Sequence, residues 1–292
     1  MIAVTGATGA LGGRVAARLA AVGDVPLRLV VRDAGRAPRL PGAEVREHSG
    51  GYGDPTGLAA ALTGVDTLYL VSAAEAQDRL RQHLDAVDAA VTAGVRRIVY
   101  TSFVGARPDA VFTLVRQHAA TEDAIRATGM RHTFLRSSMY ADFVPFFATV
   151  EDGAAVIAAP AGQGRTGFVS RDDLADVAAA VLLDGSAGLD GQSLEVTGPE
   201  ALSMAEAAAV LAEVTGRPAL YREQTVEQAW ATRRPSGHPD WEIEGWVTSY
   251  LAIAAGELAT VTDVVPSLSG HPARSVAEHL RAHPEDWSHL RG

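Results

Sequence analysis

The sequence predicts an α/β fold, namely a doubly wound (Rossmann) parallel sheet followed by a smaller mixed α/β portion. Two observations support this prediction. Segments with the unbroken apolar pattern of buried strands alternate with helix-patterned segments over residues 1–136, as in a parallel sheet that helices cover on both faces. Three glycines, Gly6, Gly9 and Gly12, stand where the first strand ends and the first helix begins, which is typical of dinucleotide-binding folds.

The strands and helices of the first part follow one another in regular order. We expect strands at residues 2–5, 27–32, 43–47, 66–72, 95–102 and 131–136. We expect helices between them, at residues 11–23, within 52–65, at 76–94 and at 112–129. Residues 1–136 are therefore expected to form an NAD(P)-binding Rossmann core.

This regular alternation ends after Arg136. Short strands around a glycine loop are expected at residues 153–170, an amphipathic helix at 171–185, and a strand, a helix and a short strand within 192–223. Ser203, with Glu206 three residues later, has the capping-box pattern of a helix start. Further helices are expected within residues 225–234, 239–258 and 270–283. We expect residues 137–292 to cover the substrate and to return some elements to the core.

Composition excludes several classes of function. The 292 residues carry a formal net charge of −10, which argues against a nucleic-acid or anionic-membrane partner. The chain has no cysteine, and all of its 25 basic residues are arginine, so thiolate chemistry and a Schiff-base lysine are excluded. No apolar run reaches the length of a membrane span, and the start of the chain lacks the pattern of a secretory signal. We expect a cytoplasmic protein.

The glycine turn predicts the cofactor class. A tight turn, a close approach of the backbone to a pyrophosphate and close helix–strand packing each need a glycine, and the helix N-terminus adds partial positive charge. The second strand ends in VVRDAGR. Arg32 and Arg36 suit the 2′-phosphate of NADP, whereas Asp33 would suit the free ribose of NAD. NADPH is therefore expected over NADH.

Other candidate sites are not supported by their patterns. SGHPDWE and SGHPARS each place a histidine beside a proline, with no second histidine at metal-ligand spacing on one helix face, so no metal is expected. The sequence contains no G-x-S-x-G motif, which would indicate a hydrolase. Asp172 and Asp173 are adjacent and fit first-turn acids favoured by the helix dipole.

Several motifs together resemble one family. TGATGALG, VVRD, YGDP, TLYLVSAAE, RRIVYTS, TFLRSSMY, RDDLADVAAAVL and LEVTGPEALSMAEAA resemble the NmrA-like, atypical branch of the short-chain dehydrogenase/reductases. Within that branch the likeness is greatest to type 2 NADPH:quinone oxidoreductases, with triphenylmethane reductases near by. The resemblance implies NADPH binding. It also implies a homodimer. The branch also contains redox-sensing regulators that bind dinucleotide without turnover.

The resemblance also implies roles for particular residues. Its phosphate turn corresponds to Gly6, Thr8, Gly9, Ala10 and Leu11, and its 2′-phosphate site to Arg32 and Arg36. The other cofactor contacts that it implies lie after the fourth, fifth and sixth strands and on the helix between the last two. They are Ser72, Ala73, Ala74, Thr101, Ser102, His118 and Arg136.

Catalysis must differ from that of most short-chain reductases, because their Tyr-x-x-x-Lys pair needs a lysine that this chain lacks. A quinone accepts hydride readily, so positioning supplies most of its catalysis. The proton would come from water, His118 or Tyr140. His118 alternatively hydrogen-bonds the cofactor ribose or caps Glu122.

Phe103, Tyr140 and Phe143 are the expected acceptor pocket. Tyr140, Phe143, Phe146 and Phe147 also have the spacing of a buried helix face, so core packing remains the alternative for at least half of them. The leading hypothesis is an NADPH-dependent oxidoreductase that transfers hydride to a small-molecule quinone or a similar conjugated acceptor. A redox sensor without turnover and a biosynthetic tailoring reductase are the two alternatives.

Overall fold

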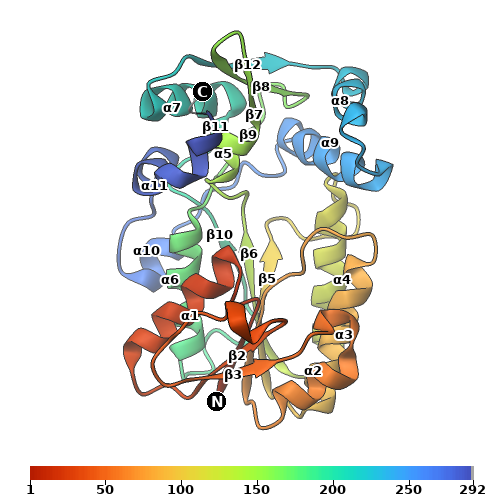
Figure 1. Cartoon of the computed structure of the whole chain (residues 1–292), viewed down its shortest axis with the longest axis vertical. Helices are drawn as coiled ribbons and strands as arrows, with labels where there is room; N and C mark the ends of the chain where they lie inside the picture. The colour runs from red at the N-terminus through yellow and green to blue at the C-terminus, as the bar shows by residue number, and fades with distance from the viewer. Residues whose placement is uncertain (291–292) are drawn as a thin grey trace. The chain divides into compact units, whose positions relative to one another are not determined.

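The computed structural model describes residues 1–290, and the chain forms two compact units (Figure 1). The first unit comprises residues 1–103, 117–136 and 174–194, and the described part of the second comprises residues 104–116, 137–173 and 195–290. The expected division lies at residue 136, with some later elements returning to the core. Residues 104–116 belong to the second unit although they precede that boundary, and residues 174–194 belong to the first.

A seven-stranded sheet forms the centre of the first unit. Its strands, in the order β10-β6-β5-β4-β1-β2-β3, are Ser193–Val196, Arg131–Ser137, Arg97–Phe103, Thr67–Leu70, Ile2–Thr5, Leu27–Val31 and Ala43–Glu47. The pairings β1–β2, β2–β3, β1–β4 and β4–β5 are parallel, with Ile2 opposite both Leu27 and Thr67. The strand order reverses between β1 and β4, and a doubly wound sheet binds ligands at the carboxyl ends of its strands at such a point. The predicted fold class is confirmed.

The last strand of this sheet, β10, comes from far along the chain. The Phe134 amide donates to the Gln192 carbonyl, and the Ser138 amide donates to the Val196 carbonyl. The second bond lies four residues further along the chain than the first on both strands, so β10 runs parallel to β6. The sequence predicts a strand here but not that it extends the central sheet.

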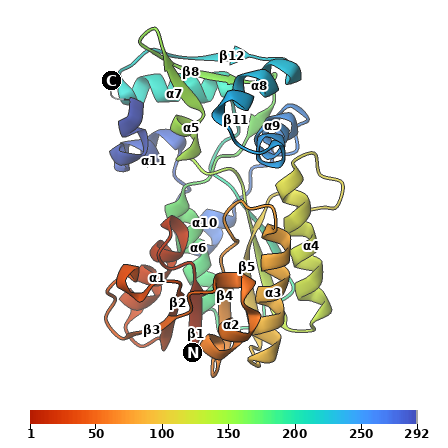
Figure 2. The same cartoon turned by 45° about the vertical axis from the view of Figure 1, so that its right-hand side comes forward.

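Helices cover both faces of the central sheet. α2 (Pro55–Leu62) and α3 (Arg79–Thr92) cover one face with α4 (Thr113–Ala127), and α1 (Ala10–Val22) and α6 (Arg171–Leu183) cover the other (Figures 1 and 2). α2 begins where it does because Asp54 caps the Gly57 amide and Pro55 occupies the first helical position. Leu58, Leu62, Ile98 and Phe134 are almost fully buried between α2, α3 and the sheet.

The second unit contains a separate three-stranded sheet in the order β12-β8-β7. β7 (Ala148–Glu151) and β8 (Ala154–Ala159) form an antiparallel hairpin, and β12 (Ala219–Glu223) pairs with β8 in parallel. A short antiparallel pair joins β9 (Arg165–Thr166) to β11 (Leu202–Ser203). The helices of this unit are α5 (Phe143–Phe146), α7 (Met204–Thr215), α8 (Val226–Arg233), α9 (Asp240–Ala254), α10 (Val264–Ser269) and α11 (Val276–Ala282).

The start of α7 follows directly from its sequence. The Ser203 hydroxyl accepts from the Glu206 amide, while the Glu206 carboxylate accepts from the Ser203 amide. The predicted capping box is confirmed. Within residues 1–290, no helix combines the length and the apolar character needed to cross a membrane.

Candidate active site

The turn between β1 and α1 depends on two of its glycines. Gly6 has φ +62°, a conformation that residues with a side chain rarely adopt. A Cβ on Gly12 would lie 2.3 Å from the Gly6 carbonyl oxygen, because the first turn of α1 packs directly against the end of β1. Any side chain at position 12 would therefore displace the helix from the turn.

The N-terminus of α1 is left open to a ligand. Gly9 is the N-cap residue, and no side chain of residues 1–290 caps the helix there. The amides of Ala10, Leu11 and Gly12 occupy the first helical turn, where no intrahelical carbonyl is available to them. Amides in this position, together with the helix dipole, bind phosphate. The residues present fit the pyrophosphate of a dinucleotide.

Arg32 and Arg36 lie exposed after β2, and Asp33 between them is occupied. Asp33 caps the short 3₁₀ helix η1 (Ala34–Arg36), and its Oδ1 accepts from the Gly35 amide at 2.8 Å. No carboxylate of residues 1–290 pairs with either guanidinium. The two arginines therefore remain available for an anion, while Asp33 is used locally.

Tyr52 joins the ends of β1 and β4 at the point where the strand order reverses. Its hydroxyl oxygen lies 2.6 Å from both Thr5 Oγ1 and the Val71 carbonyl oxygen. Burial raises the pKa of Tyr52 above its usual range. Tyr52 thus holds together the backbone beside the phosphate turn, a role that the sequence analysis missed.

The loop after β4 is held by two side chains of α3. The Ala73 amide donates to His83 Nε2 at 2.9 Å, and Arg79 Nε donates to the Ala73 carbonyl at 2.9 Å. The backbone is fixed in this way, while Ser72 and Ala73 are half-buried and Ala74 is exposed. This loop therefore presents a rigid edge beside the turn.

His118 lies in the same buried network. Arg79 Nη2 faces its Nε2 at 3.0 Å, so that nitrogen accepts, and its Nδ1 lies 2.9 Å from the Tyr100 hydroxyl. Burial, and next the positive charge of Arg79, hold the pKa of His118 well below its usual range. The ring is neutral at pH 7, and its accepting nitrogen is already bound.

This geometry bears on the roles expected for His118. Across the described chain, Glu122 binds Ser102, Arg126 and Arg136, and His118 makes no bond to it. The alternative in which His118 caps Glu122 is wrong. Phe103 lies against His118, with the two ring centres 6.2 Å apart.

The strand-end residues Thr101, Ser102 and Arg136 are tied to buried groups. Thr101 Oγ1 donates to the Tyr69 hydroxyl at 2.9 Å, and Ser102 Oγ donates to Glu122 Oε1 at 2.6 Å. Arg136 Nη2 donates to Glu122 Oε2 at 2.6 Å. Glu122 is buried, so this ion pair fixes Arg136, which keeps 18% of its side chain exposed.

Tyr140 and Phe143 lie together in the second unit. Their ring centres are 5.5 Å apart, and the Arg171 guanidinium lies 4.1 Å above the Tyr140 ring and 5.1 Å from that of Phe143. Asp142 pairs with Arg171 and so fixes this cation. The buried-face alternative does not hold for Phe146, which is 64% exposed.

Sequence reasoning missed the residues that hold the site together. Arg79 and His83 lie four residues apart on α3, and this spacing puts both on one helix face. Their spacing was a usable signal, because a histidine and an arginine on an inward face need polar partners. Tyr100 and Tyr52 carried no comparable signal.

Within residues 1–290, three features define a dinucleotide-binding protein of the doubly wound class: the sheet order, the α1 N-terminus without a side-chain cap, and two arginines after β2 that pair with no carboxylate. The chain belongs to the NmrA-like family, which is matched over residues 1–236. It is 33% identical to an NAD(P)H azoreductase of Xenophilus azovorans over 97% of this chain and 98% of the relative. It is 35% identical to a (4-alkanoyl-5-oxo-2,5-dihydrofuran-3-yl)methyl phosphate reductase of Streptomyces griseus over 99% of both.

A solved structure supports the same grouping. The chain is similar to an NADPH-dependent quinone oxidoreductase of Escherichia coli complexed with NADPH, with a TM-score of 0.84 and 31% identity over 100% of both chains. The predicted resemblance to NmrA-like quinone oxidoreductases is confirmed.

Proposed function

We propose that this protein is an NADPH-dependent oxidoreductase that transfers hydride to a quinone or a similar conjugated small molecule. The observation that carries the proposal is that Arg32 and Arg36, exposed after β2, pair with no carboxylate of residues 1–290, while the N-cap of α1 is a glycine. The relatives named above, which include an azoreductase, a quinone oxidoreductase and an unsaturated-lactone reductase, support the reductase class.

The residues of the first unit bind and orient the cofactor in this proposal. The amides of Ala10 and Leu11 hold the pyrophosphate, and Arg32 with Arg36 holds the 2′-phosphate. Ser72, Ala73 and Ala74 line the ribose, and their backbone is fixed by Arg79 and His83. Bound NADPH supplies the hydride.

The acceptor must be activated by its own conjugation. The chain contains no lysine, so no Tyr–Lys pair is present to protonate an alkoxide. A quinone, an azo bond and an acyl-butenolide each spread the incoming charge over a conjugated system. Positioning such a molecule against the cofactor then supplies most of the rate.

Tyr140 is the side chain that we propose to hold or donate the proton, with water as its alternative. His118 suits this role less well, because its ring is neutral and already accepts from Arg79. We propose that Phe103, Tyr140 and Phe143 contact the acceptor. Arg171 above Tyr140 would orient that ring.

Stopped-flow oxidation of NADPH tests the function. A benzoquinone, an azo dye and an acyl-butenolide phosphate form the acceptor panel, and each is tried with NADPH and with NADH. We expect rapid acceptor-dependent oxidation with NADPH for at least one compound and a weaker response with NADH. Tight NADPH binding without oxidation by any acceptor would favour a redox sensor instead.

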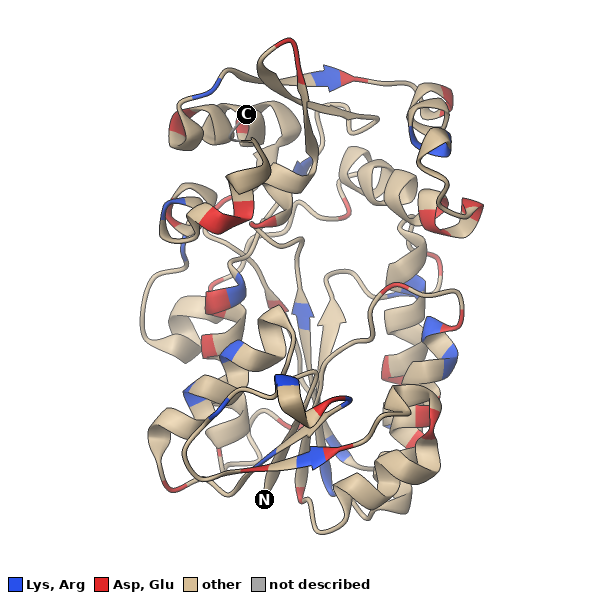
Figure 3. Cartoon of the chain, viewed as in Figure 1, with Lys and Arg blue, Asp and Glu red and all other residues tan. Residues whose placement is uncertain are grey.

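A tailoring reductase in a biosynthetic pathway is the second candidate, supported by the 35% identity to the butenolide phosphate reductase. A kcat/KM for the butenolide phosphate that exceeds those for the quinone and the dye would favour it. We further propose a cytoplasmic homodimer without nucleic-acid or membrane partners. The net charge of −10 and the mixture of acidic and basic positions in both units (Figure 3) support the absence of nucleic-acid and anionic-membrane partners.

A further inference from the structure

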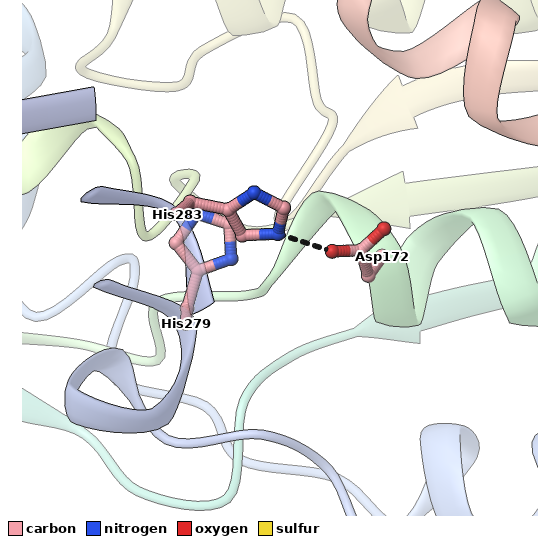
Figure 4. A group of neighbouring side chains, drawn as sticks. All are labelled: Asp172, His279 and His283. Carbon is pink, nitrogen blue, oxygen red and sulfur yellow. Dashed lines mark hydrogen bonds and ion pairs between the residues drawn. The ribbon is translucent and has the colours of Figure 1, made fainter. Parts of the chain in front are cut away.

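Two histidines and a carboxylate meet in the second unit, within a cluster outside the candidate active site. His279 lies on α11, and His283 is the C-cap residue of the same helix. Asp172 lies in the first turn of α6. Figure 4 shows both imidazole rings beside the Asp172 carboxylate. The expectation of no metal rested on the histidines beside prolines in SGHPDWE and SGHPARS, whereas His279 and His283 lie four residues apart.

The spacing of the donor atoms suits a small divalent cation. One ligand atom from each residue lies within 4.8 Å of the other two, and His283 Nε2 lies 2.6 Å from Asp172 Oδ2. A tetrahedral ion with bonds of about 2.0 Å separates its ligands by about 3.3 Å. The His283–Asp172 distance is shorter than this separation and the other two lie below 4.8 Å, so small side-chain rotations would complete the site.

The outer atoms of both rings are already oriented. His283 Nδ1 faces Glu285 Oε1 at 3.1 Å. The nitrogens of His279 face Ser170 Oγ at 2.9 Å and Asp286 Oδ2 at 3.1 Å. Whichever nitrogen of each ring binds a cation, the other keeps a partner that fixes the ring. Metal-binding histidines are held in this manner in proteins.

His279 is buried, whereas His283 and Asp172 are partly exposed to solvent. The His279 side chain is 1% exposed, whereas those of His283 and Asp172 are 19% and 20% exposed. Asp172, Glu285 and Asp286 bring three carboxylates around two imidazoles. A dication would offset the repulsion among these acids, and the partial exposure of His283 and Asp172 gives it access from solvent.

We propose that Asp172, His279 and His283 form a binding site for a zinc-class divalent cation, with water at the remaining position. Two nitrogen donors and one carboxylate oxygen are ligands that Zn²⁺ takes readily. The bound ion joins the first turn of α6 to the C-terminal residues of the chain. This inference does not rest on the proposed reductase activity.

The full-length protein is tested with ZnCl₂ after treatment with EDTA and dialysis. We expect about one zinc per chain by elemental analysis and a higher unfolding temperature with zinc than without it. His283→Gln and Asp172→Asn should abolish both effects. Glu285→Gln, which alters only an outer partner, should weaken zinc binding by about 10–100-fold.

His238→Gln is the matched control. His238 forms an exposed pair with Glu242 and no second histidine joins it in any metal-type group of the described residues, so its loss should leave zinc binding unchanged. Should the ligand variants fail to fold, Co²⁺ titration of the unchanged protein still decides. Saturable visible bands at one equivalent support the site. Equal zinc content in the unchanged protein and His283→Gln, or no Co²⁺ bands, would overturn it.

Discussion

Arg32 and Asp33 are neighbours in sequence, yet their side chains have different hydrogen-bond partners. The Asp33 carboxylate accepts a hydrogen bond from the Gly35 amide, whereas Arg32 pairs with no carboxylate of residues 1–290. The sequence alone left the choice between NADP and NAD to these two residues, because it does not show which side chain is engaged. The structure supplies the reason to favour Arg32.

Arg32→Ala should weaken NADPH binding by about 10–100-fold, the loss expected when a charge-assisted hydrogen bond to phosphate is removed. NADH binding should change little, because NADH has no 2′-phosphate. Fluorescence titration of both cofactors measures the two dissociation constants. Arg39→Ala, an exposed arginine later in the same connection, is the control. Equal losses for NADPH and NADH would contradict this assignment.

His83 should make the folded state sensitive to acid. Burial lowers the pKa of His83 to about 3, whereas the unfolded chain has its ordinary value near 6.5. Below about pH 6.5 the unfolded state therefore binds more protons, and the free energy of unfolding falls as the pH falls. This contribution is fully present above that pH.

The measurement compares the free energy of unfolding at pH 7 and pH 5 by urea denaturation. His83 should account for a loss of about 2 kcal/mol between these pH values. In His83→Gln that loss should shrink by about this amount, while His238→Gln, which alters an exposed histidine, should behave like the unchanged protein. The same pH dependence in all three proteins would refute the prediction.

At the scale of elements, α1 depends on how closely it meets β1. Gly12→Ala should destabilise the protein by about 1–3 kcal/mol, as overpacking does, and should weaken NADPH binding because the first-turn amides move. Gly185→Ala is the control, since a Cβ there would meet nothing within 4 Å. Thermal unfolding and cofactor titration measure the two effects. A Gly12→Ala protein with unchanged NADPH affinity would disprove the role given to this contact.

The elements differ in how far the sequence determines them. Strands β1, β2, β4 and β5 were predictable because each is a short apolar run beside a helical pattern. The start of α3 was expected at residue 76 but lies at Arg79, whose side chain binds the Ala73 carbonyl of the preceding loop and Gln117 and His118 of α4. Such a contact depends on tertiary structure, which no local pattern records.

At the scale of the whole molecule, each of the two units is formed by three segments that alternate along the chain. The sequence placed one boundary at residue 136, because the regular strand–helix pattern ends there. The sequence predicts that some later elements return to the core but not that these are residues 174–194, because neither an amphipathic helix nor a short strand shows which sheet it will pack against or join. For Tyr140 and Phe143, the sequence showed two aromatic residues three positions apart, but not whether they form a pocket or pack in the core.

A fragment of residues 1–136 should therefore fail to fold by itself. It lacks α6 and β10, so apolar surface on one sheet face and the edge of β6 would be exposed. We expect an aggregated product or one without cooperative unfolding by circular dichroism. The full-length protein is the control. A monomeric fragment with a sharp thermal transition and NADPH binding would contradict this view.

The late arrival of β10 has a consequence for synthesis in the cell. β6 ends at Ser137 and β10 ends at Val196, so 59 residues must be added after β6 before β10 is complete. At roughly 5–20 residues per second, a ribosome needs about 3–12 s to supply them. During that interval the nascent sheet has an open edge, and a chaperone that shields exposed strands would have its main opportunity to act.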